Sequence, residues 1–425
     1  MIIHVVKPGE SLYSIARFYG ASPNKVATEN ELSDPNRLVI GQTLVITEGT
    51  SRHRVQPGQT IYQIANQYGV SISAIRAANP QITNIALIYP GQIINIPIRQ
   101  QKRGTIEVNG YAFPNINVDV LRKTLPYLTY LSIFSYEVNP DGTFKPINDQ
   151  ALITAAKAAK VAPLMVITNI SEGGFSSDLA KTILTNKTIQ DKLLNNVIEN
   201  MKSKGYHGLD VDFEFIYPEN REDYNNFLRN AASKLRPLGF TLTTAVAPKT
   251  SADQKGLLYE AHDYPVHGAL TDHVIPMTYE WGYTYSQPRA VAPINEVRKV
   301  INYAVSAIPR KKILMGIPNY GYDWTLPYVK GTAAKSVSNT QAVDIARDRG
   351  AVIKYDTVSK SPYFNYYDTN KKQHEVWFED ARSIQAKLEL VDEMDLGGVS
   401  YWTINRFFPQ NWLVLNSMFD IAKVE

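Results

Sequence analysis

The sequence has no cysteine among its 425 residues, so neither disulfide bonds nor thiolate metal sites can form. It also has no apolar run long enough for a membrane-spanning helix, and we expect no membrane insertion. Its seven histidines are scattered, with neither a HExxH motif nor a paired spacing, and it has no glycine-rich phosphate loop. We therefore expect neither a metal ion nor a cofactor.

Neither sign of charge is in large excess either. The formal net charge is +4, too weak to indicate nucleic acid as a partner, although residues 51–100 contain four arginines and no acidic residue. That basic stretch serves either solubility, the interpretation we favour, or contact with an anionic surface. The first residues, Met1 to Lys7, lack the basic and apolar regions of a cleavable signal peptide, so we expect none.

The N-terminal part of the chain is an internal duplication. The run from His4 to Gly20 reappears from His53, 49 residues later. Each copy predicts a strand, a Pro-Gly turn, a helix closed by glycine, a second short helix ending near an asparagine, and a final strand. Thr60 with Gln63 predicts a capping box, and Ser22 before a proline predicts a helix start. We expect two small α+β units, residues 1–48 and 51–98.

These copies resemble LysM domains in the opening V-x-P-G motif, the mid-repeat asparagine and the closing G-Q-x-[LI]-x-I motif. The resemblance implies binding of glycans that contain N-acetylglucosamine, such as peptidoglycan or chitin, in a shallow groove contacted largely by loop backbone. Taken one at a time, the glycines could equally be plain turn and cap residues. The implied contact residues are Gly9, Ser11, Leu12 and Asn30 in the first copy and Gly58, Thr60, Ile61 and Asn79 in the second.

From residue 104 to 425, apolar strand-like runs alternate with helical stretches, which predicts an α/β fold, a (β/α)8 TIM barrel. About 80 residues between the seventh and eighth strands exceed what one helix needs. They alternate about a turn at 368–372, which predicts a hairpin within a small α+β insertion at about 325–378. The predicted strands are 105–111, 130–136, 163–170, 208–215, 241–247, 273–279, 312–317 and 397–402.

The fourth predicted strand carries three acids at a spacing of two, Asp210, Asp212 and Glu214, so all three point to the same side. Leu209, Val211, Phe213 and Phe215 are expected to fill the other side. A solvated edge strand is the alternative, and this apolar face argues against it. Because like charges so close cannot all be ionised, at least one acid should keep its proton to unusually high pH, as a general acid requires.

This strand resembles the Asp-x-x-Asp-x-Asp-x-Glu signature of family 18 glycoside hydrolases, matched at its last three positions, with His207 at the first. We expect this departure to alter packing at the far end of the strand without abolishing catalysis. Further similarities are Ser132-x-Phe134-Ser-Tyr136, Met277-Thr-Tyr279-Glu280 and Trp402.

The resemblance implies retaining hydrolysis in which the 2-acetamido oxygen of the substrate attacks C1. Glu214 would protonate the glycosidic oxygen, and Asp212, sharing a proton with Asp210, would orient the acetamide. Tyr279 would donate to the acetamide oxygen, although ordinary barrel packing is the alternative for Tyr279 and for Trp402. The implied substrate-binding residues are Trp402, Met277, Glu280 and Tyr136.

The whole arrangement of two repeats and a barrel is similar to the spore cortex-lytic N-acetylglucosaminidases. That similarity implies action on cortex peptidoglycan during germination, and we expect a monomer. It also implies a place in the coat and cortex region of the spore, reached from the mother cell without a signal peptide. A chitinase or chito-oligosaccharide hydrolase, and a non-catalytic glycan-binding coat protein, remain alternatives.

Overall fold

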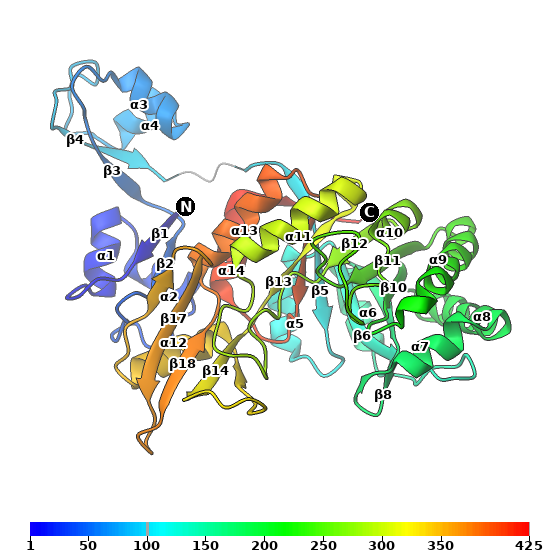
Figure 1. Ribbon diagram of the computed structural model, residues 1–425. Coiled ribbons are helices and arrows are strands. Elements are labelled where there is room, and N and C mark those ends of the chain that lie inside the picture. Colours follow the sequence, from blue (N-terminus) through cyan, green and yellow to red (C-terminus); the bar gives the residue numbers. More distant parts are fainter. Residues whose placement is uncertain (99–101, 425) are drawn as a thin grey trace.

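The computed structural model describes residues 1–98 and 102–424, and its largest part is a barrel of eight parallel strands (Figure 1). Each of the eight predicted strands is confirmed to within a few residues. The barrel strands are β5 (Thr105–Ala112), β6 (Tyr130–Glu137), β7 (Ala162–Thr168), β10 (Gly208–Asp212), β11 (Thr241–Val246), β12 (His273–Pro276), β13 (Leu314–Pro318) and β19 (Gly398–Trp402).

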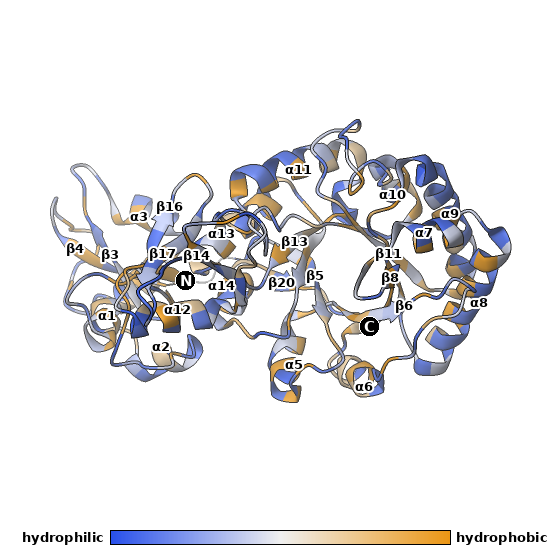
Figure 2. Cartoon of the chain, turned by 60° about the horizontal axis from the view of Figure 1, so that its bottom comes forward, coloured by the Kyte–Doolittle hydropathy of each residue, from blue (hydrophilic) through white to orange (hydrophobic). Residues whose placement is uncertain are grey.

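The strands follow the order β12-β11-β10-β7-β6-β5-β19-β13, and a single bridge between Val274 and Ile313 joins the two ends. The predicted barrel is therefore confirmed as a nearly closed one. Helices surround it (Figure 2). They are α5 (Val118–Thr124), α6 (Gln150–Ala158), α7 (Ser177–Leu184), α8 (Lys187–Lys204), α9 (Arg221–Leu235), α10 (Tyr264–Leu270), α11 (Ile294–Ala307), α13 (Ala381–Glu393) and α14 (Pro409–Met418).

The burial pattern of these elements explains the fold. Every residue of β7 is buried, as expected for a parallel strand covered on both faces. Helix α8 buries Leu193, Leu194, Val197 and Met201, which lie on one face at helical spacing. In the part of the chain that the structure describes, every helix is too short or too polar to cross a membrane.

The insertion lies between β13 and β19 and forms an antiparallel sheet in the order β15-β14-β18-β17-β16, with one helix. The predicted hairpin is confirmed, because β17 and β18 pair about residues 368–372. The elements of the insertion are β14 (Gly321–Leu326), β15 (Lys335–Val337), α12 (Asn339–Asp348), β16 (Lys354–Asp356), β17 (Ser361–Tyr367) and β18 (Gln373–Trp377).

Each N-terminal repeat consists of two antiparallel strands and two helices. The predicted capping box is confirmed at Thr60 and Gln63, and Ser22 caps the helix that begins at Pro23. The elements are β1 (Ile2–Val5), α1 (Leu12–Tyr19), α2 (Pro23–Glu29) and β2 (Thr43–Ile46), then β3 (Thr50–Arg54), α3 (Ile61–Tyr68), α4 (Ile72–Ala77) and β4 (Ile93–Pro97).

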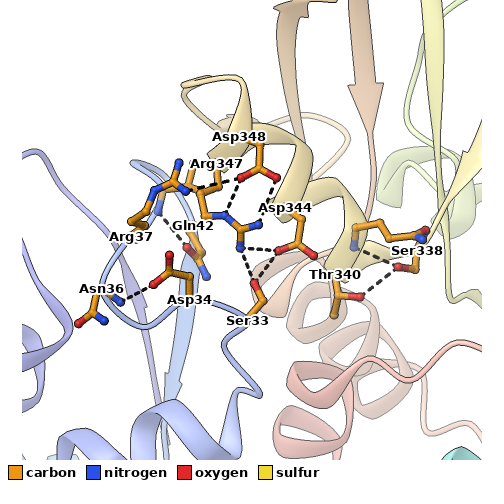
Figure 3. Close-up of polar contacts among 12 residues, drawn as sticks. Ser33, Asp34, Asn36, Arg37, Gln42, Ser338, Thr340, Asp344, Arg347 and Asp348 are labelled. Carbon is orange, nitrogen blue, oxygen red and sulfur yellow. Dashed lines mark hydrogen bonds and ion pairs between the residues drawn. The ribbon is translucent and has the colours of Figure 1, made fainter.

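The first repeat is built into the catalytic part of the chain. Thr43 Oγ1 donates to Gln410 Oε1 (2.7 Å), and Gln410 Nε2 donates back to the Thr43 carbonyl oxygen (2.6 Å). Val45 belongs to the buried core of the barrel. In Figure 3, Ser33 lies against Asp344 and Arg347 of α12; its hydroxyl donates to Asp344 (2.6 Å) and accepts from Arg347 Nη1.

The second repeat stands away from the barrel (Figure 1). It touches the first repeat at the start of β3, where Thr50 Oγ1 donates to the Tyr19 carbonyl and the Arg52 guanidinium lies 4.7 Å from the Phe18 ring centroid. Within the described ranges, no hydrogen bond joins residues 51–98 to the barrel. Two copies of one motif thus have different surroundings.

Candidate active site

A cavity of about 320 Å³ opens at the carboxyl ends of the barrel strands, where catalytic sites of such barrels lie. It brings together six of the predicted site residues, which lie at the ends of β10, β12 and β19 or just beyond them: Asp212, Glu214, Met277, Tyr279, Glu280 and Trp402. Its lining consists of Tyr111, Phe134, Phe175, Asp212, Glu214, Ala245, Pro248, Leu258, Tyr259, Met277, Tyr279, Glu280, Trp281 and Trp402.

The three acids lie at successive heights in the barrel. Asp210 is fully buried below the cavity, where it accepts a hydrogen bond from Ser132 Oγ (2.9 Å), while Asp212 and Glu214 line the cavity. Strand β10 ends at Asp212, so Glu214 lies on the turn that follows. The expectation that Phe215 fills the opposite face is wrong. The chain turns there with a positive φ of 54°, which leaves the side chain 38% exposed.

Two side chains that the sequence did not point to hold the segment around Glu214. Buried Asn169, just beyond β7, accepts from the Glu214 amide through Oδ1 (2.9 Å) and donates to the Glu214 carbonyl through Nδ2 (2.8 Å). His262 Nδ1 accepts from the Ala247 amide (2.8 Å), so its proton is on Nε2 and is donated to the Phe213 carbonyl (3.0 Å). Burial lowers the pKa of His262 to about 4, so the ring is neutral.

Burial and mutual repulsion keep protons on the acids. Burial raises the pKa of Asp210 to about 6. For Asp212, burial and then the charges of Glu214 and Asp210 raise the pKa well above its usual value. Burial, and then the charge of Glu280, raises the pKa of Glu214 to about 7. Glu214 can therefore carry a proton near neutral pH, as a general acid must.

The wall around these acids is aromatic. The Trp402 ring contacts Phe134, Tyr111 and Phe113 edge-on, with centroids 4.8, 5.3 and 5.9 Å away. Burial and then the charges of Asp212 and Glu214 raise the pKa of Tyr279 well above its usual value, so its phenol remains a hydrogen-bond donor. An apolar floor beside such a donor suits a sugar ring that carries one polar substituent.

Glu280 closes one side of the cavity with a backbone φ of 68°. Its carboxylate accepts hydrogen bonds from the Tyr320 hydroxyl and from the Tyr322 hydroxyl (3.1 Å). Both tyrosines come from the segment that enters the insertion, and no spacing in the sequence links them to β12. The insertion thereby supplies part of the site.

The structure does not bring Tyr136 to the cavity. Its hydroxyl donates to Asp149 and accepts from Lys204 Nζ (2.8 Å), and the ring is fully buried outside the site. The reason is a register shift in the pairing of β6 with β7 between Ile133 and Tyr136. Side-chain alternation is broken there, so Tyr136 leaves the face that Ser132 and Phe134 share, and of these strand residues Phe134 lines the cavity.

Most implied contact residues of the repeats serve the repeats' own fold. The side chain of buried Asn30 bonds to the backbone of Val26 and Val45, and buried Asn79 does the same in the second copy. Ser11 and Thr60 cap helices. Gly9 and Gly58 lie in open space, Ser11 and Thr60 are exposed, and Leu12 and Ile61 are buried. The accessible implied positions are thus those of the Pro-Gly loops and the helix caps.

Comparison with known proteins agrees with this geometry. The sequence profile of glycosyl hydrolases family 18 matches residues 106–406, and that of the LysM domain matches residues 4–47 and 53–97. The chain belongs to glycosyl hydrolase family 18. It is therefore a glycoside hydrolase that carries two LysM domains.

The similarity to individual proteins extends over the whole chain. The cortical fragment-lytic enzyme of Bacillus subtilis (strain 168) is 43% identical over 100% of this chain and 99% of its own length. The crystal structure of the Bacillus megaterium QM B1551 spore cortex-lytic enzyme SleL superposes with a TM-score of 0.92 at 42% identity, covering 99% of this chain and 98% of that one. A chitinase from Chromobacterium violaceum shares the fold over 74% of this chain, at 24% identity and a TM-score of 0.69.

Proposed function

We propose that this family 18 enzyme hydrolyses N-acetylglucosaminyl bonds in spore cortex peptidoglycan, or in fragments of it, during germination. The observation that carries the proposal is the full-length similarity to the B. subtilis cortical fragment-lytic enzyme, which includes both LysM domains. The place of action is the coat and cortex region of the spore. The proposal includes a monomeric enzyme.

The proposed mechanism begins with Glu214 as the acid. Its raised pKa keeps a proton available for the glycosidic oxygen, and the two hydrogen bonds from Asn169 fix the backbone of Glu214. As the leaving sugar departs, the 2-acetamido oxygen of the substrate attacks C1 and forms an oxazolinium ion. Glu214, now a carboxylate, then accepts a proton from the attacking water.

Asp212 and Tyr279 hold the acetamide in this scheme. Asp212 accepts from the acetamide N–H and opposes the positive charge of the ring, while the Tyr279 hydroxyl donates to the acetamide oxygen. The charge of Asp210 contributes to the raised pKa of Asp212, which supports a proton shared between the two. Trp402 forms the apolar floor beneath the sugar.

The LysM domains divide the work in this proposal. The second repeat anchors the enzyme to the glycan polymer, because its surface is not covered by the barrel. The first repeat acts mainly as a part of the catalytic unit, as its buried contacts with Gln410 indicate. Anchoring raises the local concentration of substrate without new chemistry at the site.

Mass spectrometry of the products tests the proposal. Cortex fragments should yield products with N-acetylglucosamine at the reducing end, and chito-oligomers should be poor substrates. A thiazoline mimic of the oxazolinium ion should inhibit, and Asp212→Asn should weaken both this inhibition and turnover. Activity confined to chitin would replace the proposal by the chitinase alternative. A covalent ester on Asp212 or Glu214, trapped by a fluorosugar, would refute the role of the acetamide.

A further inference from the structure

A second cavity, of about 400 Å³, adjoins the catalytic one. The two share Trp402 and Glu280, so a sugar chain that places one residue over Trp402 can place a neighbouring residue here. Beyond the shared pair, its lining consists of Phe113, Asn319, Tyr320, Tyr322, Ser336, Thr403, Asn405 and Arg406. It is therefore more polar than the catalytic floor and contains one cationic side chain.

Arg406 is an exposed residue at the second cavity, and three contacts hold the loop that carries it. Its Nη1 donates to Ser336 Oγ (2.9 Å) on the insertion. Its carbonyl oxygen accepts from Nδ2 of buried Asn319 (2.5 Å), and the Asn405 side chain next to it accepts from the Phe113 amide (2.9 Å). The loop that carries the guanidinium is thus tied to β13, to the insertion and to the loop after β5.

Arg406 has no acidic partner within the cavity. In the described ranges 1–98 and 102–424, no carboxylate lies within the 4.0 Å of an ion pair with it. The one acid in the same cavity, Glu280, accepts from Tyr320 and Tyr322 instead. A guanidinium has five N–H donors and matches a carboxylate with two of them, and only Ser336 uses one here.

We propose that Arg406 binds a carboxylate on the sugar that neighbours the one over Trp402, and that it thereby selects acidic glycans over neutral ones. This inference rests on the proposed function, in which the sugar over Trp402 is N-acetylglucosamine. In peptidoglycan its neighbour is muramic acid, whose lactyl group ends either in its own carboxylate or in that of an attached amino acid or peptide. Chitin offers no carboxylate at that position.

Closing the carboxylate into a lactam provides a neutral reference of nearly the same shape. Three sets of fragments are compared with chito-oligomers: free lactyl, L-alanine- or peptide-substituted, and lactam. Arg406→Gln should lower kcat/KM on the carboxylate fragments about 10-fold or more, because a charge-assisted hydrogen bond is lost. It should leave lactam fragments and chito-oligomers within about 2-fold, since neither engages the charge. Whichever acidic set loses more identifies the source of the carboxylate.

Two further variants separate charge from fold. Arg406→Lys should retain part of the preference, because the charge remains without the two-pronged geometry. Arg122→Gln, which removes an exposed arginine from α5, should leave all substrates unchanged and serves as the matched control. Equal losses by Arg406→Gln on acidic and neutral substrates, or no loss on either, would overturn the inference.

A binding measurement keeps this inference distinct from the proposed function. In the Glu214→Gln background, titration of acidic and lactam fragments should show an affinity difference that Arg406→Gln abolishes. The LysM domains are identical in both proteins, so the difference reports on the cleft. If the wild-type enzyme cleaves only chitin, the cortex proposal is wrong, but the affinity difference still decides the role of Arg406. If acidic and lactam fragments bind equally well, that role is refuted, whatever the enzyme cleaves.

Discussion

Replacing Glu280 by glutamine should move the alkaline limb of the kcat/KM profile to lower pH. Protonated Glu214 is the active acid, so kcat/KM falls as pH rises through its pKa of about 7. A neighbouring negative charge disfavours ionisation of Glu214, and Glu280 supplies that charge. Without it Glu214 loses its proton at lower pH, so the loss of activity begins earlier as pH rises.

The structure limits the size of this shift. The pKa of Glu214 rises from 4.5 to about 7, with burial as the larger cause and Glu280 as the smaller. Removing the smaller cause should therefore move the limb by no more than about one pH unit. Activity at about pH 5 should stay close to that of the wild type, because Glu214 remains largely protonated there and glutamine still offers an oxygen to the hydroxyls of Tyr320 and Tyr322.

The assay is kcat/KM on one soluble fragment from about pH 4.5 to 9 at constant ionic strength. The control is Glu219→Gln, which removes a negative charge from an exposed turn outside the cavity and should leave the limb in place. Because Asp212 and Glu214 interact, the fitted values belong to the pair. An alkaline limb that stays in place or moves to higher pH in Glu280→Gln would refute the electrostatic reasoning.

Other predictions follow from the same contacts. Glu214→Gln should reduce kcat about 10²–10⁴-fold with an unchanged unfolding temperature, and more than half of wild-type turnover would remove it from the acid role. Asn169→Ala should lower kcat and cost about 1–3 kcal/mol of unfolding free energy, because it strands the Glu214 amide; an unchanged melting curve would contradict this. Deleting residues 51–98 should weaken sedimentation with insoluble peptidoglycan but spare activity on soluble fragments. Deleting residues 1–98 should also lower the unfolding temperature, and equal stability of the two deletions would argue against a docked first repeat.

The catalytic strand was predictable because its periodicity and its chemistry lie in five consecutive residues, from Asp210 to Glu214. Asn169 and His262 were not, because each acts from a distant segment that only the closed barrel brings near. Tyr136 was misjudged since a local register shift leaves no mark in a strand-like sequence. Periodicity thus predicts which elements form, while register shifts and contacts between distant segments decide which side chains reach the cavity.

The different surroundings of the two repeats were also beyond sequence reasoning. Val39 and Thr43 of the first copy are 5% and 2% exposed. At the corresponding positions of the second copy, counted from the Gly-Gln motif, Tyr89 and Ile93 are 66% and 41% exposed. The smaller side chains are the ones that dock, and hydropathy alone does not select them, because Val39 is more hydrophobic than Tyr89 but Thr43 is less hydrophobic than Ile93. Tertiary context decides such cases.

The docking of the first repeat determines which parts of this protein can be exchanged. A chimaera that replaces residues 51–98 by another carbohydrate-binding module cuts only backbone and a few contacts near Thr50, so the second repeat is a replaceable cassette. A chimaera that replaces both repeats leaves the Gln410 amide without Thr43 and uncovers an apolar face of the barrel. The first repeat and the barrel of this protein therefore form one unit of exchange.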